Sequence, residues 1–313
     1  MEDLGALAEV VQGLSEKAMR EAIAALPDGE YESVMTNNPL GQVLRYPVKL
    51  RIAGSSMEID FEGAPPQLPQ GGLNSTLNYT AAHATYPLKC MLTPTVRGNA
   101  GCYRPFTVKA PEGSVLNCSY PASVNLRTRT GWYIAPNIFK ALSAAAPRQV
   151  QSFTGLAVAA NIYGQDAQGR YYSDMLFCGG GQGGSARGDG QSTLLWPTSA
   201  ANTSIELIES RAPVLVLEKS YVTDSGGAGQ QRGGLGQRVR LRKRDDDGLN
   251  VRARVENIYQ YRGFDSIPGD DLRGRLRWWG LYTQRKPGID GGKTAQLEPH
   301  ELDDRYFMMR VRS

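Results

Sequence analysis

Residues 47–63, "PVKLRIAGSSMEIDFEG", consist of two strand-like runs around a short turn. Each run is rich in Val, Leu, Ile, Met and Phe at spacings typical of a half-buried strand. Gly54 and Ser55 separate the runs, and a two-residue connection with glycine is a common loop of an antiparallel hairpin. We therefore predict a hairpin of strands 47–53 and 56–63.

Helical patterns flank this hairpin. Residues 2–25 carry apolar side chains at helical spacing with charges between them, which predicts one amphipathic helix closed by a turn at residues 27–31. The Ala-rich segment 74–92 and the segment 135–147, which Pro147 ends, predict two further helices. The apolar positions of the first helix are Leu4, Leu7, Val11, Leu14, Ala18, Ala22 and Leu26.

The rest of the chain alternates short strands with turns. A helix, then strands, then a helix, then more strands indicates an α+β fold with mixed, mainly antiparallel sheets and a few helices. We treat residues 1–313 as a single region with a possible subdivision near residue 150. The predicted strands are a pair within 104–117 about a Pro-Glu-Gly turn, 156–164, 170–179, 237–244 and 251–260.

Composition narrows the classes of function. The chain has 313 residues, 41% hydrophobic, with 36 glycines and 18 prolines, which suggests a globular protein with many turns. Its start is acidic and it has no apolar stretch of about 20 residues, so we expect a cytoplasmic protein with no membrane partner. A net charge of +4 without aromatic-plus-basic modules argues against nucleic acid. The four cysteines are widely spaced and are expected to be reduced.

Two glycine-rich segments invite a nucleotide interpretation. Residues 178–184, "CGGGQGG", satisfy G-x-G-x-x-G, but the sequence that follows is poorly suited to begin a helix, so no dinucleotide site is expected. In residues 224–236, "DSGGAGQQRGGLG", Leu235 stands where a phosphate-binding loop needs lysine. A structural turn is the favoured interpretation. The alternative is an anion contact to backbone amides, with Gly226, Gly227 and Gly229 as candidates.

Three polar residues are candidate catalytic residues, each with an ordinary structural alternative. Arg104 could clamp a carboxylate or simply pair with Glu112. Asp189 could ligate a cation or cap the backbone, and His83 could act as a general base or be a buried structural histidine. The two histidines lie in unlike contexts far apart in the sequence, so no metal site is predicted.

Two other features have alternative interpretations. Asn99, between glycines, favours a turn with positive φ. A row of arginines at period two is either a solvated basic face or a docking surface for an acidic partner. These arginines are Arg238, Arg240, Arg242 and Arg244, extended by Arg252 and Arg254 across the turn "DDDGLN".

Several motifs occur together in one order: "NAGCYRPFTVKAPEGSVLN", "YPASVNLRT", "ALSAAAP", "CGGGQGGSARGDGQS" and "TSIELIESRAPVLVLEKSYVTDSGGAGQQRGGLG". In that order and spacing the chain resembles the hydantoinase B/oxoprolinase family from about Leu14 to about Arg312. It is similar to the C-terminal half of a B-type subunit, without the family's N-terminal metal-binding part. It also resembles a small subunit of acetophenone carboxylase-type complexes.

The resemblance implies a function shared with partners. It implies a subunit of an ATP-dependent carboxylase of the acetone or acetophenone type, or of a cyclic-amide hydrolase, inactive alone. Such a subunit would complete or regulate the site that receives a phosphorylated intermediate of a small-molecule substrate. ATP and a divalent metal are expected in partner subunits, including a hydantoinase A-like ATP-binding subunit, with no cofactor held by this chain. The alternatives are a self-contained metal-dependent amidohydrolase and a purely structural subunit.

Overall fold

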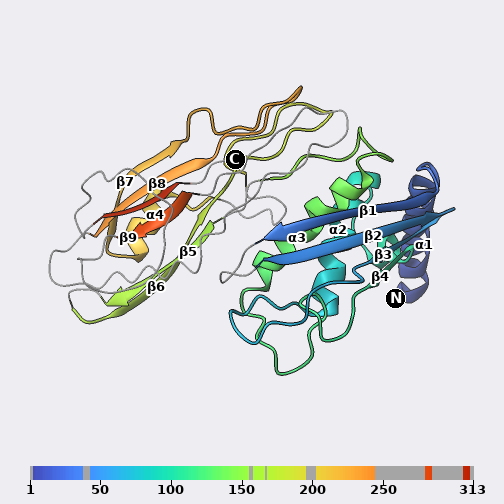
Figure 1. Cartoon of the computed structure of the whole chain (residues 1–313), viewed down its shortest axis with the longest axis horizontal. Helices are drawn as coiled ribbons and strands as arrows, with labels where there is room; N and C mark the ends of the chain where they lie inside the picture. Colours follow the sequence, from blue (N-terminus) through green and yellow to red (C-terminus); the bar gives the residue numbers. More distant parts are fainter. Residues whose placement is uncertain are drawn as a thin grey trace. The chain divides into compact units, whose positions relative to one another are not determined.

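The computed structural model describes residues 3–37, 43–154, 158–165, 168–194, 202–243, 279–283 and 306–310. The chain forms two compact units (Figure 1). The described residues up to Phe153, together with Gly184–Gly188, belong to the first unit. Thr154–Gly183 and the described residues from Asp189 to Lys243, with the strands near the C-terminus, belong to the second.

A four-stranded sheet forms the centre of the first unit. Its order is β1 (Gly29–Asn37), β2 (Leu44–Ala53), β3 (Ser56–Asp60) and β4 (Phe106–Lys109). The first three strands are antiparallel, and β4 runs parallel to β3. The predicted hairpin is confirmed: Ala53 pairs with Ser56, and Gly54 takes a φ of +57°, which glycine adopts readily.

Three helices accompany this sheet: α1 (Leu4–Ala24), α2 (Leu77–Leu92) and α3 (Arg127–Leu142). The first two match the predicted helices. The third begins eight residues before its predicted start of 135 and ends before 147. It is buried along most of its length and packs against β1 and β2, while α2 packs against α3 (Figure 1).

The face between α3 and the sheet is the core of the first unit. The rings of Tyr46 and Tyr133 stack there with centroids 5.7 Å apart. Asn137 on α3 is fully buried and bridges to β2 and β1: its Nδ2 donates to the Tyr46 carbonyl at 2.7 Å, and its backbone oxygen accepts from the Ser33 hydroxyl at 2.7 Å. The buried polar groups of Asn137 and Ser33 are thus hydrogen-bonded, which offsets the cost of removing them from water.

Two sheets and one helix make up the described part of the second unit. Strands β5 (Val158–Gln165) and β6 (Tyr171–Cys178) form an antiparallel pair, as predicted. The other sheet has the order β7 (Val214–Tyr221), β8 (Gln237–Lys243), β10 (Tyr306–Arg310) and β9 (Trp279–Thr283), with antiparallel neighbours throughout. The short helix α4 (Ile205–Arg211) contacts β6 and β7 and is capped by the Ser204 hydroxyl.

The α+β fold with mainly antiparallel sheets is therefore confirmed, with two corrections to its elements. Strand β1 and helix α4 were not predicted. Only one strand, β4, forms within 104–117, because Ser114 and Asn117 make an isolated bridge beyond the turn. The predicted strand 251–260 lies outside the described residues, and β8 is hydrogen-bonded on its two edges by β7 and β10.

Candidate functional site

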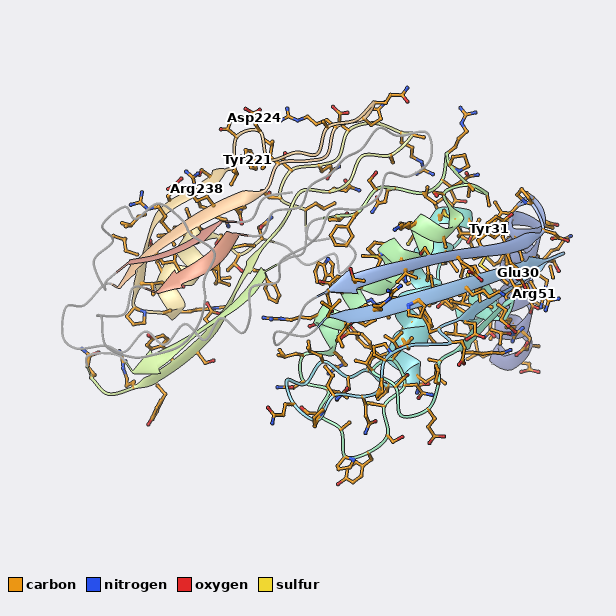
Figure 2. All side chains as sticks on the ribbon, viewed as in Figure 1. Glu30, Tyr31, Arg51, Tyr221, Asp224 and Arg238 are labelled. Atoms are coloured by element: carbon orange, nitrogen blue, oxygen red, sulfur yellow. The ribbon has the colours of Figure 1, made fainter. Side chains whose placement is uncertain are left out.

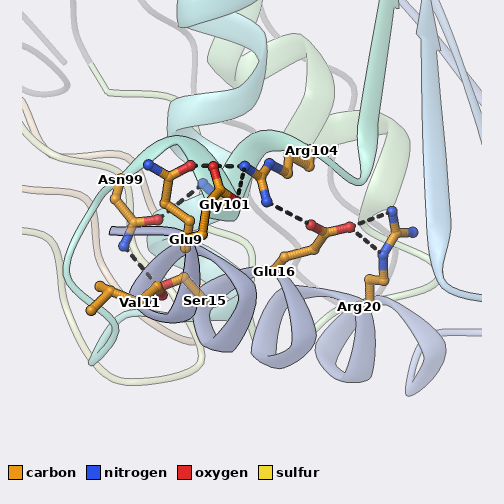
Figure 3. A network of polar contacts seen from close by, with 9 residues as sticks. Glu9, Val11, Ser15, Glu16, Arg20, Asn99, Gly101 and Arg104 are labelled. Atoms are coloured by element: carbon orange, nitrogen blue, oxygen red, sulfur yellow. Dashed lines mark hydrogen bonds and ion pairs between the residues drawn. The ribbon is translucent and has the colours of Figure 1, made fainter. Parts of the chain in front are cut away.

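Arg104 lies at the centre of a polar network between α1 and the short 3-10 helix η2 (Ala100–Tyr103), shown in Figure 3. Its Nη2 donates to Gln12 Oε1 at 2.8 Å and lies 3.3 Å from Glu9 Oε2, while its Nη1 lies 3.3 Å from Glu16 Oε2. The expectation of a Glu112 partner is wrong, because the contacts come from α1. Arg104 therefore joins two elements of the first unit.

The charges of this network stabilise one another. The pKa of Glu16 is lowered, first by its hydrogen bond from Arg20 and then, against the opposing effect of burial, by Arg104. The pKa of Arg104 is raised by its hydrogen bonds to Glu16 and Glu9. These groups are solvent-accessible, and exposed pairs contribute little to stability. They connect Arg104, directly after η2, to three residues of α1.

Asn99 and Gly101 explain the conformation of the segment "NAGCY". Asn99 has a φ of −153°, so the predicted positive φ is wrong. Its side chain caps η2 by accepting from the Gly101 amide at 2.9 Å, and its Nδ2 donates to the Ser15 hydroxyl at 2.8 Å (Figure 3). A Cβ on Gly101 would lie 1.9 Å from the Gln12 carbonyl oxygen of α1. Glycine is therefore needed for close approach of two backbones.

A hollow of about 360 Å³ lies beside this network on the polar side of α1. Its charged walls are Glu16, Lys17, Arg20 and Glu21. These charges pair with each other, Arg20 with Glu16 at 2.8 Å and Lys17 with Glu21 at 4.0 Å. The hollow is shallow and open to solvent, and its charged side chains are paired with one another.

His83 lies between α2 and α3 beside an aromatic ring and a guanidinium group. Its ring is 4.3 Å from the ring of Tyr79, and the guanidinium carbon of Arg127 lies 5.4 Å from the same Tyr79 ring. Burial lowers the pKa of His83, against a hydrogen bond with the Gly131 backbone. A Cβ on Gly131 would lie 2.7 Å from the Tyr79 ring. The contacts support the structural alternative for His83, as a neutral imidazole in a helix–helix contact.

The stability of the first unit is expected to fall as the pH drops below about 6.5, the ordinary pKa of histidine. The unfolded chain binds a proton on His83 near that pH, whereas the folded chain binds it only at lower pH. The contribution of neutral His83 is thus complete above the unfolded pKa and is lost as the pH falls through the folded pKa. The slope is at most about 1.4 kcal/mol per pH unit.

Urea unfolding of the wild type and of His83→Asn between pH 5 and 8 measures this slope, with the other histidine present in both proteins. The pH dependence of the free energy of unfolding should differ between the two proteins only on the acidic side, below about pH 6.5. Parallel curves for the two proteins would show that His83 is protonated equally in the folded and unfolded states.

Asp189 caps the second glycine-rich segment. Its Oδ1 accepts from the Arg232 amide at 2.7 Å, and the neighbouring Gly190 amide donates to the Arg232 carbonyl at 2.7 Å. These contacts support backbone capping, rather than cation binding, as the role of Asp189. The two glycine-rich segments thus lie side by side, which the sequence did not predict.

Further backbone contacts continue this joint between residues 178–194 and 224–236. The Gly234 amide donates to the Gln182 carbonyl at 2.8 Å, and the Thr193 amide donates to the Leu235 carbonyl at 2.9 Å. A Cβ on Gly234 would lie 2.0 Å from the Gln191 carbonyl oxygen. Glycine lets the two backbones approach closely here, since side chains would hold the segments apart. We call these two hydrogen-bonded segments the glycine joint.

The candidate anion contacts lie at one end of the glycine joint. The Gly233 amide donates to the Gly227 carbonyl at 2.9 Å, and a Cβ on Gly226 would lie 2.2 Å from the Gly233 carbonyl oxygen. Gly229 is exposed. Asp224 adopts a φ of +53° at the exposed bend (Figure 2). The contacts of Gly226 and Gly227 support the structural turn, and an anion contact stays a prediction.

The basic strand face is partly neutralised. Arg238 Nη1 and Arg240 Nη1 lie 3.4 and 3.5 Å from the carboxylate of Glu218 on β7, and Val239 and Leu241 are buried on the opposite face. Burial raises the pKa of Glu218, but hydrogen bonds from Ser220 and the two arginines lower it overall. Figure 2 shows Arg238 on this strand. The side chain of Arg242, and Arg244, Arg252 and Arg254, lie outside the described residues.

The described residues contain neither a cluster of metal ligands nor a membrane-spanning helix. Within these ranges, no three His, Cys, Asp or Glu side chains lie close enough together to hold a metal ion. No helix in the described part of the chain is long and apolar enough to cross a membrane.

The four cysteines are free thiols, namely Cys90, Cys102, Cys118 and Cys178. Burial raises the pKa of the Cys178 thiol to about 12.

The fold and these contacts define an α+β protein in which the polar and glycine-rich motifs join segments distant in sequence. The chain belongs to the hydantoinase B/oxoprolinase family, whose sequence profile matches residues 1–264. The B component of a D-/L-hydantoinase of Pseudomonas sp. strain NS671 is 31% identical over 281 residues, covering 85% of this chain and 47% of that protein. The chain thus spans about half the length of this relative.

Two solved structures share the fold. The ATP-dependent caprolactamase of Pseudomonas jessenii matches with a TM-score of 0.63 and 27% identity, over 74% of this chain and 42% of that chain. A nucleotide-free acetone carboxylase matches with a TM-score of 0.66 and 18% identity, over 77% and 36%. Separately, a ferredoxin sulfite reductase of Mycobacterium tuberculosis is 57% identical over 70 residues, 22% of this chain and 13% of that enzyme.

Proposed function

We propose that this chain is a B-type component of an ATP-dependent enzyme that hydrolyses a cyclic amide. The observation that carries the proposal is its similarity to the hydantoinase B component, at 31% identity, and to ATP-dependent caprolactamase, at 27%. The similarity to acetone carboxylase, at 18% identity, supports a shared fold and makes ketone carboxylation the second choice. Both reactions fit a complex of several subunits.

The chemistry explains why such an enzyme needs ATP. A cyclic amide is stabilised by resonance, and transfer of the γ-phosphoryl group of ATP to its oxygen releases ADP and makes the carbon electrophilic enough for water to attack. Phosphate then leaves, and the ring C–N bond breaks to give the open-chain amino acid. We assign ATP binding to a hydantoinase A-like subunit and the divalent metal to partner polypeptides, in the cytoplasm. This chain then completes the cavity that receives the activated amide. The structural contacts of Arg104 and Asp189 support a shaping role for these residues.

Reconstitution tests this proposal. The chain is co-purified with the hydantoinase A-like subunit and other B-type polypeptides of its source, and phosphate release from ATP is measured with hydantoin, caprolactam, or acetone plus bicarbonate. We expect turnover with a cyclic amide only when this chain is present, and no turnover by the chain alone. The matched control is the same mixture without this chain.

Other outcomes would replace the proposal. If the mixture turned over acetone plus bicarbonate but neither hydantoin nor caprolactam, the chain would belong to a carboxylase. Amide hydrolysis by the isolated chain, with stoichiometric zinc or manganese found by elemental analysis, would make it a self-contained amidohydrolase. Equal turnover with and without the chain would leave it a purely structural subunit.

A further inference from the structure

Helix α1 carries more apolar surface than the first unit covers. Its buried residues are Ser15, Met19 and Ile23, all in its second half, and every residue from Asp3 to Val11 is exposed. The side chains that the helical period predicted as one apolar face are therefore largely in solvent. Leu4, Leu7, Val10, Val11 and Leu14 are between 47% and 66% exposed. We call these five residues the α1 stripe.

The α1 stripe has the spacing of a coiled-coil seam. Leu4, Leu7, Val11 and Leu14 follow one another at intervals of three, four and three residues, the alternation that places side chains along one line of a helix. A clustered apolar face of this kind on a soluble protein marks an interaction site more often than scattered single residues do. The stripe therefore fits a second helix.

We propose that the α1 stripe pairs with the α1 stripe of a second copy of this chain, in antiparallel orientation. In this arrangement Leu4 packs beside the partner's Leu14, and Leu7 beside the partner's Val11. Two-fold symmetry makes each contact occur twice, as in most soluble homodimers.

Charge selects the antiparallel orientation. Asp3, the N-cap of α1, whose Oδ1 accepts from the Gly5 and Ala6 amides, and Lys17 lie seven residues on either side of Val10. An antiparallel pair brings Asp3 near the partner's Lys17 at each end, with the two Val10 side chains meeting between them. A parallel pair would bring Asp3 beside Asp3 and would align the two helix dipoles.

The helix is already formed before it pairs. An isolated helix of two heptads is marginal in water, but α1 has 21 residues, is capped by Asp3 and is held by its second half. Pairing therefore does not require folding of the stripe. Four apolar layers make a small interface, so we expect a weak dimer with a Kd on the order of micromolar.

Sedimentation equilibrium of the 313-residue chain across this concentration range tests the proposal. We expect a monomer–dimer equilibrium that Leu7→Glu weakens at least about 100-fold, because the charge is buried twice in a symmetric pair. Ala24→Glu is the matched control: Ala24 is exposed and lies ten residues, about 15 Å along α1, beyond Leu14, the last residue of the stripe. Circular dichroism checks that each variant is folded.

Crosslinking tests the orientation. In a Cys90→Ser background, which removes the exposed thiol, a short bismaleimide should link Val10→Cys to itself and should leave Leu4→Cys unlinked. Linking of Leu4→Cys alone would indicate a parallel pair and overturn the antiparallel arrangement. A chain that stays monomeric at all concentrations, or a dimer that Leu7→Glu and Ala24→Glu weaken equally, would overturn the proposal. These outcomes do not depend on the enzymatic function proposed above.

Discussion

Gly101→Ala is expected to lower the free energy of unfolding of the first unit by about 3 kcal/mol, the upper part of the range for overpacked sites. The added Cβ would lie 1.9 Å from the Gln12 carbonyl oxygen and 2.7 Å from its carbon, both backbone atoms of α1. A backbone cannot rotate away as a side chain can. Helix α1 must therefore move from η2, which also disrupts the contacts of Arg104 and Asn99 with α1.

Gly13→Ala on the facing helix is the matched control for this prediction. A Cβ at Gly13 meets nothing within 4 Å, and the residue lies in the interior of α1. Alanine there should raise the stability by about 0.5–1 kcal/mol, because glycine costs more backbone entropy in a helix. Urea unfolding followed by circular dichroism measures both variants. If Gly101→Ala were as stable as the wild type, the close approach of η2 and α1 would be wrong.

Gly234→Ala is expected to have a similarly large effect, about 3 kcal/mol, on the second unit. Its Cβ would lie 2.0 Å from the Gln191 carbonyl oxygen, so the glycine joint must open. Opening breaks the backbone hydrogen bonds that Gly234, Thr193 and Gly190 donate across the joint. Hydrogen exchange should therefore become much faster at these three amides, while amides of β1 and β2 in the first unit keep their protection.

Ala228→Gly provides the control in the same loop. Ala228 is exposed, and the exchange of one small residue for another there should change stability by less than about 0.5 kcal/mol. The same variants test the predicted anion contact of Gly226, Gly227 and Gly229. Loss of folding without a selective loss of activity in the reconstituted enzyme favours the structural turn. A folded Gly234→Ala protein with activity lost would favour the anion contact.

The elements that the sequence predicted are those whose apolar period is regular. The hairpin of β2 and β3 and the helices α1 and α2 fall in this group. Strand β1 was missed because two of its three buried residues, Ser33 and Asn37, are polar. They are tolerated inside because Asn137 accepts from the Ser33 hydroxyl and Asn37 Oδ1 accepts from the Tyr46 hydroxyl at 3.3 Å. Those partners lie too far along the chain for a local pattern to indicate them.

The candidate site residues show the same limit. The sequence singled out Arg104, Asp189 and His83 as polar residues within distinctive motifs, and left a chemical and a structural alternative for each. The contacts that support the structural alternative come from distant segments: α1 for Arg104, residue 232 for Asp189 and the start of α3 for His83. Glycine enrichment indicated a special backbone, but only the folded chain identified its neighbour.

Local features could be read from the sequence: strand and helix periods, the turn at Gly54 and Ser55, and the motifs of the hydantoinase B/oxoprolinase family. Only the folded chain shows which face of α1 is buried and which glycine-rich segments meet. A helical or strand period fixes the direction of side chains relative to their own backbone, whereas burial depends on the segment that packs opposite them. Met19 and Ile23 face the first unit, while Leu7 and Leu14 remain in solvent.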